Sequence, residues 1–183
     1  NEFFDLLSTT FYYTFFGTIG SIVFGILTAQ LVNQKFFGRT FMRSVLLFPY
    51  VGPVVALAYT WELLLDPYSG TLNNLLMNFQ VIQEPLNLLG QKYLTVNFFG
   101  FDLKLRLALT TVIIFEIWRY FPLAFLFILA RLQAVPKELY EAAEVDGAGP
   151  LQKFINITLP QITAVISILF MIRFIWNFNK FED

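Results

Sequence analysis

The segment KELYEAAEVDGAGPLQKFINITLP, residues 137–160, is a polar interruption between two long apolar runs. It contains four acidic residues, two lysines, two glycines and two prolines. Proline suits the first position of a helix, so Pro136 and Pro150 each mark a helix start. Glycine is the usual residue in the left-handed turn that ends a helix. The segment is therefore predicted to be a helix, a sharp turn at Gly147 and a second helix, which Pro160 kinks or ends.

The runs around this segment are long enough, or nearly so, to cross a bilayer as helices, which takes about 20 residues. They cover residues 11–32, 45–65, 107–132 and 161–176. The last run is the shortest, so its helix is expected to start earlier or to continue further. Because backbone groups in lipid must bond within their own segment, the chain is predicted to be an all-α, polytopic membrane protein with four transmembrane helices.

The composition supports a membrane protein and excludes several classes of active site. Hydrophobic residues make up 57% of the 183 residues and charged residues 14%, with a mean hydropathy of +0.63. Soluble domains carry about 25% charged residues. The absence of cysteine and histidine excludes disulfides, thiol nucleophiles and histidine acid–base chemistry in these residues. A net charge of −1 gives no indication of nucleic-acid binding.

The distribution of basic residues predicts an orientation, because cytoplasmic loops are enriched in Lys and Arg. Residues 33–44 carry three basic side chains and no acid, and are expected to be cytoplasmic. Alternation of the spans then places the loop 66–106 outside and the loop 133–160 inside, with the N-terminus outside. Lys104 and Arg106 do not follow this rule. The loop 66–106 is rich in turn residues, and a short helix is expected around 72–79.

The spacing of the polar segment resembles the EAA loop of permease subunits of ABC importers, written EAA-x3-G-x9-I-x-L-P. The matching positions are Glu141, Ala142, Ala143, Gly147, Ile157, Leu159 and Pro160. Residues 38–61, 66–76 and 117–148 are also similar to the carbohydrate-uptake subgroup of these permeases. The resemblance covers nearly the whole chain. It implies that the chain holds spans two to five of a six-span permease core, with both termini truncated, in the cytoplasmic (inner) membrane of a bacterium or archaeon.

The resemblance also implies a coupling role for the loop. Glu141 would anchor it on a cytoplasmic ATPase, while Ala142 and Ala143 would allow close contact. Gly147 would make the turn, and three residues would fix the loop to the next span: Ile157, Leu159 and Pro160. The implied partners are an ATPase subunit dimer that binds ATP, a second permease subunit and an extracytoplasmic substrate-binding protein. This chain itself would need no cofactor and would not be an enzyme.

Polar residues within the apolar runs are candidates for a substrate path, since ionisable groups in a span are costly. Glu116 and Arg119 are three residues apart and can share a helix face as an ion pair or as part of a path lining, with Tyr120 beside them. Three further candidates lie near the end of the last run: Trp176, Asn177 and Asn179. The asparagine side chains can hydrogen-bond sugar hydroxyls, and the tryptophan ring can stack on a sugar face or serve as a membrane anchor or packing group.

Three functions are consistent with these observations. The first is an ATP-driven importer permease for a sugar, with glycerol phosphate or another polyol-like solute as the alternative cargo. The second is an ion-coupled secondary transporter in which Glu116 carries protons. The third is a structural membrane subunit without a substrate path. The sequence alone does not identify the solute.

Overall fold

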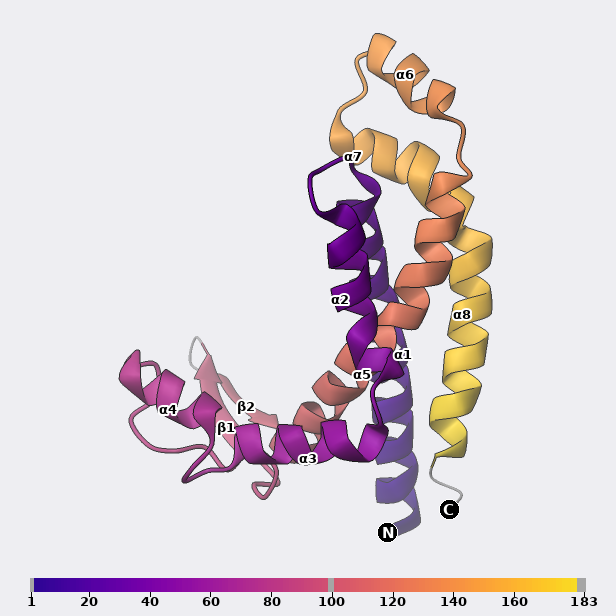
Figure 1. Cartoon of the computed structure of the whole chain (residues 1–183). Helices are drawn as coiled ribbons and strands as arrows, with labels where there is room; N and C mark the ends of the chain where they lie inside the picture. The colour runs from indigo at the N-terminus through magenta and orange to yellow at the C-terminus, as the bar shows by residue number, and fades with distance from the viewer. Residues whose placement is uncertain (1, 99–100, 181–183) are drawn as a thin grey trace. The chain divides into compact units, whose positions relative to one another are not determined.

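The computed structural model describes residues 2–98 and 101–180, which form two compact units. Unit 1 comprises Asn1–Tyr50 and Ile117–Asp183, and unit 2 comprises Val51–Glu116. Figure 1 shows the helical segments of unit 1. They are α1 (Glu2–Asn33), α2 (Arg39–Val51), most of α5 (Leu107–Gln133), α6 (Lys137–Val145), α7 (Pro150–Lys153), the π-helix η1 (Phe154–Thr158) and α8 (Leu159–Asn179).

The core of unit 1 lies where α1, α5 and α8 pack against one another. Its buried apolar residues are Ile22, Ala29, Val32, Phe121, Ala124, Phe125, Ile128, Leu129, Leu132, Ile162 and Leu169. Gly25 permits a close approach of α1 to α5, because a Cβ atom there would lie 2.6 Å from Ala124 Cβ and 2.9 Å from the backbone nitrogen of Phe125. Small residues at helix contacts are typical of membrane proteins, in which packing rather than water exclusion holds helices together.

Three helical stretches are long and apolar enough to cross a membrane: Phe3–Asn33, Leu107–Gln133 and Pro150–Asn179. A fourth crossing is reached if α2 and α3 (Val54–Leu65) together make one span. The predicted all-α, polytopic membrane fold is confirmed. Helix α1 begins earlier than the predicted start at residue 11, and the last span also begins earlier, as expected.

The second predicted span, residues 45–65, is not one continuous helix. Helix α2 ends at Val51 and α3 begins at Val54. Pro53 has no N–H to continue the hydrogen-bond ladder, and its ring disfavours the helical conformation for Gly52 before it. Gly52-Pro53 therefore divides the run, a correction to the sequence-based prediction.

The last span contains a π-helical turn at Phe154–Thr158, where Leu159 N–H donates to the carbonyl of Phe154. Pro160 follows this turn inside α8 and does not end the helix. In an α-helix the ring of Pro160 would clash with the carbonyl four residues earlier, at Asn156. The wider turn accommodates this proline, and π-turns of this kind are frequent at functional sites.

Unit 2 contains α3, α4 (Thr71–Asn78), the strands β1 (Leu94–Phe98) and β2 (Phe101–Leu105), and the first residues of α5. Helix α4 confirms the short helix predicted around 72–79. The two strands pair in antiparallel orientation with Leu94 opposite Leu105, a pairing that was not predicted from the sequence. Buried Asn73 ties α4 to the following loop, since its amide donates to Leu86 O at 2.9 Å and accepts from Leu86 N–H at 3.1 Å.

The carboxylate of Asp66 caps the turn between α3 and α4. Ser69 N–H and its hydroxyl donate to Asp66 Oδ1 at 2.7 and 2.9 Å, and Tyr68 N–H donates at 3.0 Å. The backbone and side-chain hydrogen bonds from Ser69, followed by that from Tyr68, hold the pKa of Asp66 below its ordinary value. These hydrogen bonds favour the ionised carboxylate. They stabilise the turn fully at a pH above the ordinary pKa of aspartate, and this stabilisation is lost as the pH falls through the lowered pKa of Asp66.

Candidate functional site

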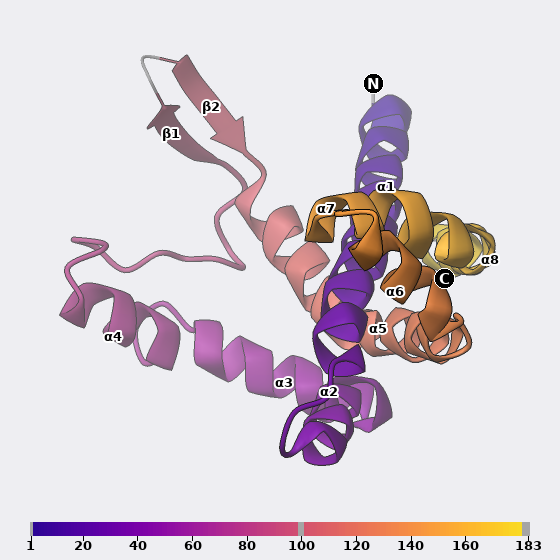
Figure 2. The same ribbon diagram turned by 90° about the horizontal axis from the view of Figure 1, so that it is seen from above.

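Residues 137–158, here named the α6–η1 segment, form the candidate site predicted from the sequence. In Figure 1 this segment lies at one end of unit 1, beyond the C-terminal ends of α1 and α5. Figure 2, seen from above, again places α7 beside α1. The segment thus covers the end of the helix bundle from which residues 33–44 also emerge.

The turn between α6 and α7 is a Schellman motif, which satisfies carbonyls at the end of α6. Ala148 N–H donates to Ala143 O at 2.8 Å, and Gly147 N–H donates to Glu144 O at 3.0 Å. Gly147 has a φ of +76°, and a Cβ atom added there would meet no other atom within 4 Å. The glycine is therefore required by the left-handed backbone and not by a close neighbour.

Side-chain contacts fix the position of α6 relative to α7 and η1. Lys153 Nζ lies 2.7 Å from Glu144 Oε1, and the hydroxyls of Tyr140 and Thr158 are 3.1 Å apart. Gly149 N–H donates to Gln152 Oε1 at 2.8 Å and so caps α7. These bonds join both sides of the turn, so the α6–η1 segment is a small structured unit and not a loose loop.

The structure divides the seven motif residues into an outward and an inward group. Glu141, Ala142 and Gly147 are exposed, and α6, all of which is described, has no buried residue. Ala143 and Ile157 are half-buried, and Leu159 packs against the core of unit 1. Pro160 is exposed beside the π-turn that precedes it. The amino-terminal part of the motif is thus presented outward, while Leu159 packs against the bundle.

The exposed face of the segment is also apolar. Its exposed apolar side chains are Leu139, Val145, Leu151 and Ile155, and Val145 is 89% exposed. Exposed apolar groups next to the acidic side chains of α6 are suited to contact with a partner protein.

A second cluster gathers three cationic groups around the ring of Tyr120 in unit 1. The guanidinium carbons of Arg173 and Arg119 lie 3.8 and 4.8 Å from the ring centroid, and Lys180 Nζ lies 4.6 Å from it. Arg119 also donates to the Tyr120 hydroxyl at 3.1 Å. Cations over an aromatic face are stabilised most when they are removed from water, and Arg173 is 1% exposed.

The predicted path residues do not all belong to this cluster. Asn177 is buried and donates to Thr18 Oγ1 at 3.3 Å, whereas Trp176 and Asn179 are exposed. Glu116 is buried at the end of unit 2. Lys180 and Thr18, the polar neighbours of Tyr120 and Asn177, were not predicted from the sequence.

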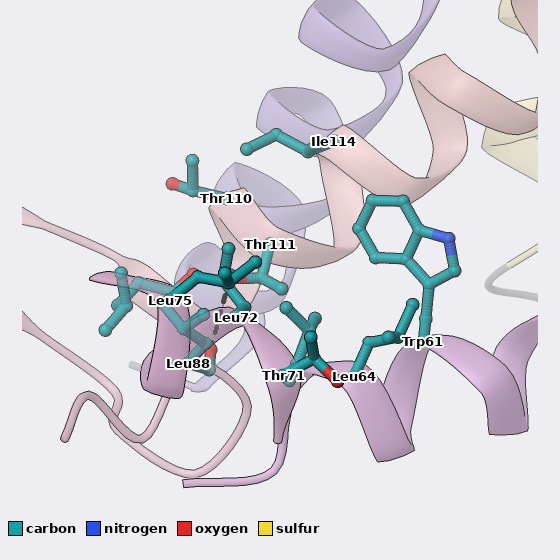
Figure 3. A pocket seen from close by; sticks show the side chains of 11 residues that line it. Trp61, Leu64, Thr71, Leu72, Leu75, Leu88, Thr110, Thr111 and Ile114 are labelled. Carbon is teal, nitrogen blue, oxygen red and sulfur yellow. Dashed lines mark hydrogen bonds between the residues drawn. The ribbon is translucent and has the colours of Figure 1, made fainter. Parts of the chain in front are cut away.

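An apolar pocket of about 490 Å³ lies within unit 2, between α3, α4 and the first residues of α5. Figure 3 shows Trp61, Leu72 and Ile114 turned toward it. The hydroxyl of Thr111 is directed at the carbonyl of Leu88, 3.2 Å away, and does not offer a free donor to the pocket. The pocket suits an apolar group and not a hydroxylated solute. Among residues 2–98 and 101–180, no three His, Cys, Asp or Glu residues group as metal ligands.

Comparison with protein families gives a match over residues 21–181. The matching family is described as the binding-protein-dependent transport system inner membrane component. The match includes the α6–η1 segment and all of α5 and α8.

Curated relatives extend this similarity to the whole chain. The inner membrane ABC transporter permease protein YcjO of Escherichia coli K12 is 36% identical over 181 residues, which is 99% of this chain and 58% of YcjO. The trehalose/maltose transport system permease protein MalF of Thermococcus litoralis is 30% identical over 181 residues, 99% of this chain and 56% of MalF. The chain therefore spans somewhat more than half the length of these relatives.

A solved structure shares the fold. The crystal structure of a bacterial alginate ABC transporter in complex with an alginate pentasaccharide-bound periplasmic protein aligns with a TM-score of 0.73 and 24% sequence identity. The alignment covers 91% of this chain and 53% of the transporter chain.

Proposed function

Because the chain belongs to the family of binding-protein-dependent transport system inner membrane components, we propose that it forms part of the translocation path of an ATP-driven importer for a sugar or similar solute. As a permease component it is not itself an ATPase, and it is a multi-pass component of the inner membrane. ATP hydrolysis is assigned to a separate cytoplasmic subunit dimer. A second permease subunit completes the path.

The observation that supports this proposal is that α6, the helix that carries the EAA positions, has no buried residue. Glu141 and Ala142 are exposed on α6, while Leu159 packs into the core at the start of the last span. A force applied to α6 is transmitted through the Tyr140–Thr158 contact and η1 into α8. In the proposed mechanism, closure of the ATPase dimer moves α6 and thereby the spans as rigid bodies, so that access alternates between the two sides.

Two features support a carbohydrate-type solute. The relative MalF is a trehalose/maltose permease by name, and the alginate transporter that shares the fold was crystallised with a saccharide-bound periplasmic protein. We assign to the present chain a corresponding extracytoplasmic binding protein as partner. In unit 1, Arg119, Tyr120 and Asn177 supply hydrogen-bonding groups at which solute hydroxyls can bind as the helices move apart. Trp176, Asn179 and Glu116 remain further candidates for the path.

The coupling role is tested by Glu141→Lys in the full-length permease, reconstituted in liposomes with its ATPase and binding protein. We expect the variant to insert normally but to lose most ATP-driven uptake, because a lysine replaces an exposed acid on the surface proposed to meet the ATPase. Asp146→Lys is a matched control: it makes the same charge change at the end of α6, where the helix dipole favours a cation. Normal uptake by Glu141→Lys, with normal binding of the ATPase, would refute the coupling role.

The buried carboxyl group of Glu116 is the one observation that favours the ion-coupled alternative. The same liposomes discriminate between the two mechanisms. Uptake that continues without the ATPase and stops when the proton gradient is collapsed would establish a secondary transporter. Absence of uptake under every condition, with the complex intact, would leave the structural-subunit interpretation.

A further inference from the structure

A polar pocket of about 400 Å³ lies within unit 1, between the C-terminal end of α1 and the α6–η1 segment. Gln30 and Asn33 line it from the end of α1 and Gln34 from the residue that follows, while Tyr140, Lys153 and Phe154 line it from α6, α7 and η1. Its volume is within the range of small-molecule sites. It is separate from the apolar pocket of unit 2 and from the cluster around Tyr120.

The chemistry of the lining is that of a site for hydroxyl groups. Each side-chain amide of Gln30, Asn33 and Gln34 offers both donors and an acceptor, and no described residue hydrogen-bonds to these three side chains. Sugar hydroxyls likewise donate and accept. Tyr140 and Phe154 also line the pocket and add flat apolar surface, against which the C–H face of a sugar ring can lie.

The charge of the lining excludes a strongly anionic ligand. Lys153 is the single charged residue in the lining, and its ammonium group lies 2.7 Å from the carboxylate of Glu144. The pair leaves the pocket without net charge. The pocket is not lined by the basic residues before α2 or in its first turns, which are Lys35, Arg39 and Arg43. A phosphate-bearing headgroup would therefore find no uncompensated cation there.

We propose that this pocket binds a small neutral polyhydroxylated solute, a mono- or disaccharide, from the side of the membrane that bears the α6–η1 segment. The inference rests on the proposed function, because the ligand belongs to the class of the proposed cargo. A solute in the pocket contacts α1 as well as Tyr140 and Phe154. It holds the α6–η1 segment against the bundle, so that accumulated cargo slows further transport.

The binding test uses the full-length permease complex in nanodiscs, without the binding protein, and radiolabelled glucose, maltose and trehalose as probes. We expect at least one of these sugars to bind, and Gln30→Leu with Asn33→Leu to weaken binding by about tenfold or more, since two amide contacts are removed. Gln133→Leu is the matched control, because Gln133 is an exposed amide at the end of α5 that does not line the pocket. Equal loss in the control, or no binding of any sugar to the unmodified complex, would overturn the proposal.

The regulatory consequence is tested in proteoliposomes by the initial rate of uptake with and without the bound sugar on the side that bears α6. We expect inhibition in the unmodified transporter and at least tenfold weaker inhibition in the Gln30→Leu, Asn33→Leu variant. Inhibition that is unchanged in this variant would contradict the assignment, even if ATP-driven uptake is normal. The sugar assignment would also be contradicted if an anionic phospholipid copurified tightly with the unmodified complex and was lost from the variant. Failure of ATP-driven uptake itself would refute the proposed function and leave the sugar-binding result to stand separately.

Discussion

At the scale of single residues, Gly147 determines the direction of the chain between α6 and α7. Its positive φ was predictable from the sequence, because a glycine follows a run of helical spacing in the position where helices end. The neighbours of Tyr120 were not predictable in the same way. Arg119 is adjacent in sequence, whereas Arg173 and Lys180 approach from α8, more than fifty residues away, and only tertiary packing places them.

Replacement of Gly147 by alanine should strain the turn without creating a clash. A non-glycine residue in the left-handed region costs about 1–2 kcal/mol, and the space around Gly147 is open. We expect ATP-driven uptake in liposomes to fall several-fold while the amount of permease in the membrane is unchanged.

Gly149→Ala is the control for this prediction. Gly149 has a φ of −70°, and its nearest neighbour to an added Cβ is Gln152 Oε1 at 3.8 Å. Alanine fits there, so uptake should remain close to that of the unmodified protein. Equal defects in the two variants would show that the backbone conformation at Gly147 is not the cause.

At the scale of elements, the apolar runs predicted which segments are helical, but not where the helices change their geometry. Residues 45–65 were predicted as one span because their hydropathy is continuously apolar. Hydropathy does not reflect the missing N–H of Pro53, which breaks the helix. The π-turn before Pro160 and the strands at residues 94–98 and 101–105 were missed for a related reason. A π-turn differs from an α-turn by one residue, and the two strands are five residues each, which gives too few positions for a clear alternation.

Gly25→Ala tests how closely α1 and α5 must pack. The added Cβ would lie 2.9 Å from the backbone nitrogen of Phe125, which cannot move alone, so the helices must separate at a cost of about 1–3 kcal/mol. We expect a lower midpoint of thermal unfolding for the detergent-solubilised protein, measured by fluorescence.

Gly20→Ala provides the comparison on the same helix. A Cβ at Gly20 would meet Cδ1 and Cγ1 of Ile117, both of them side-chain atoms, so relief there does not require the backbone of α5 to move. Gly20→Ala should therefore lower the midpoint of thermal unfolding less than Gly25→Ala does. The reverse order would mean that the α1–α5 contact at Gly25 is not a determinant of stability.

At the scale of the whole molecule, the orientation in the membrane remains a prediction from the basic residues of 33–44. The sidedness can be measured because these 183 residues contain no cysteine, so single cysteines can be introduced without background from this region. Tyr68 and Val145 are suitable positions, being 88% and 89% exposed.

We expect a membrane-impermeant maleimide to label Tyr68→Cys in intact spheroplasts and Val145→Cys only after permeabilisation. The reason is that cytoplasmic loops are enriched in basic residues, which places α6 inside. Labelling of both positions from the same side, in a protein that still transports, would contradict the predicted alternation of the spans.

The exposed surfaces of the long helices are themselves apolar, with Phe11, Leu31 and Met171 among the side chains that are more than half exposed. In a bilayer, separation of α1, α5 and α8 therefore transfers side chains from protein to lipid and not to water. The heat capacity of unfolding of soluble proteins comes largely from the hydration of newly exposed apolar groups. Calorimetry of this protein in lipid should thus give a small heat-capacity change, and its free energy of unfolding should vary almost linearly with temperature, without the maximum near room temperature that soluble domains show.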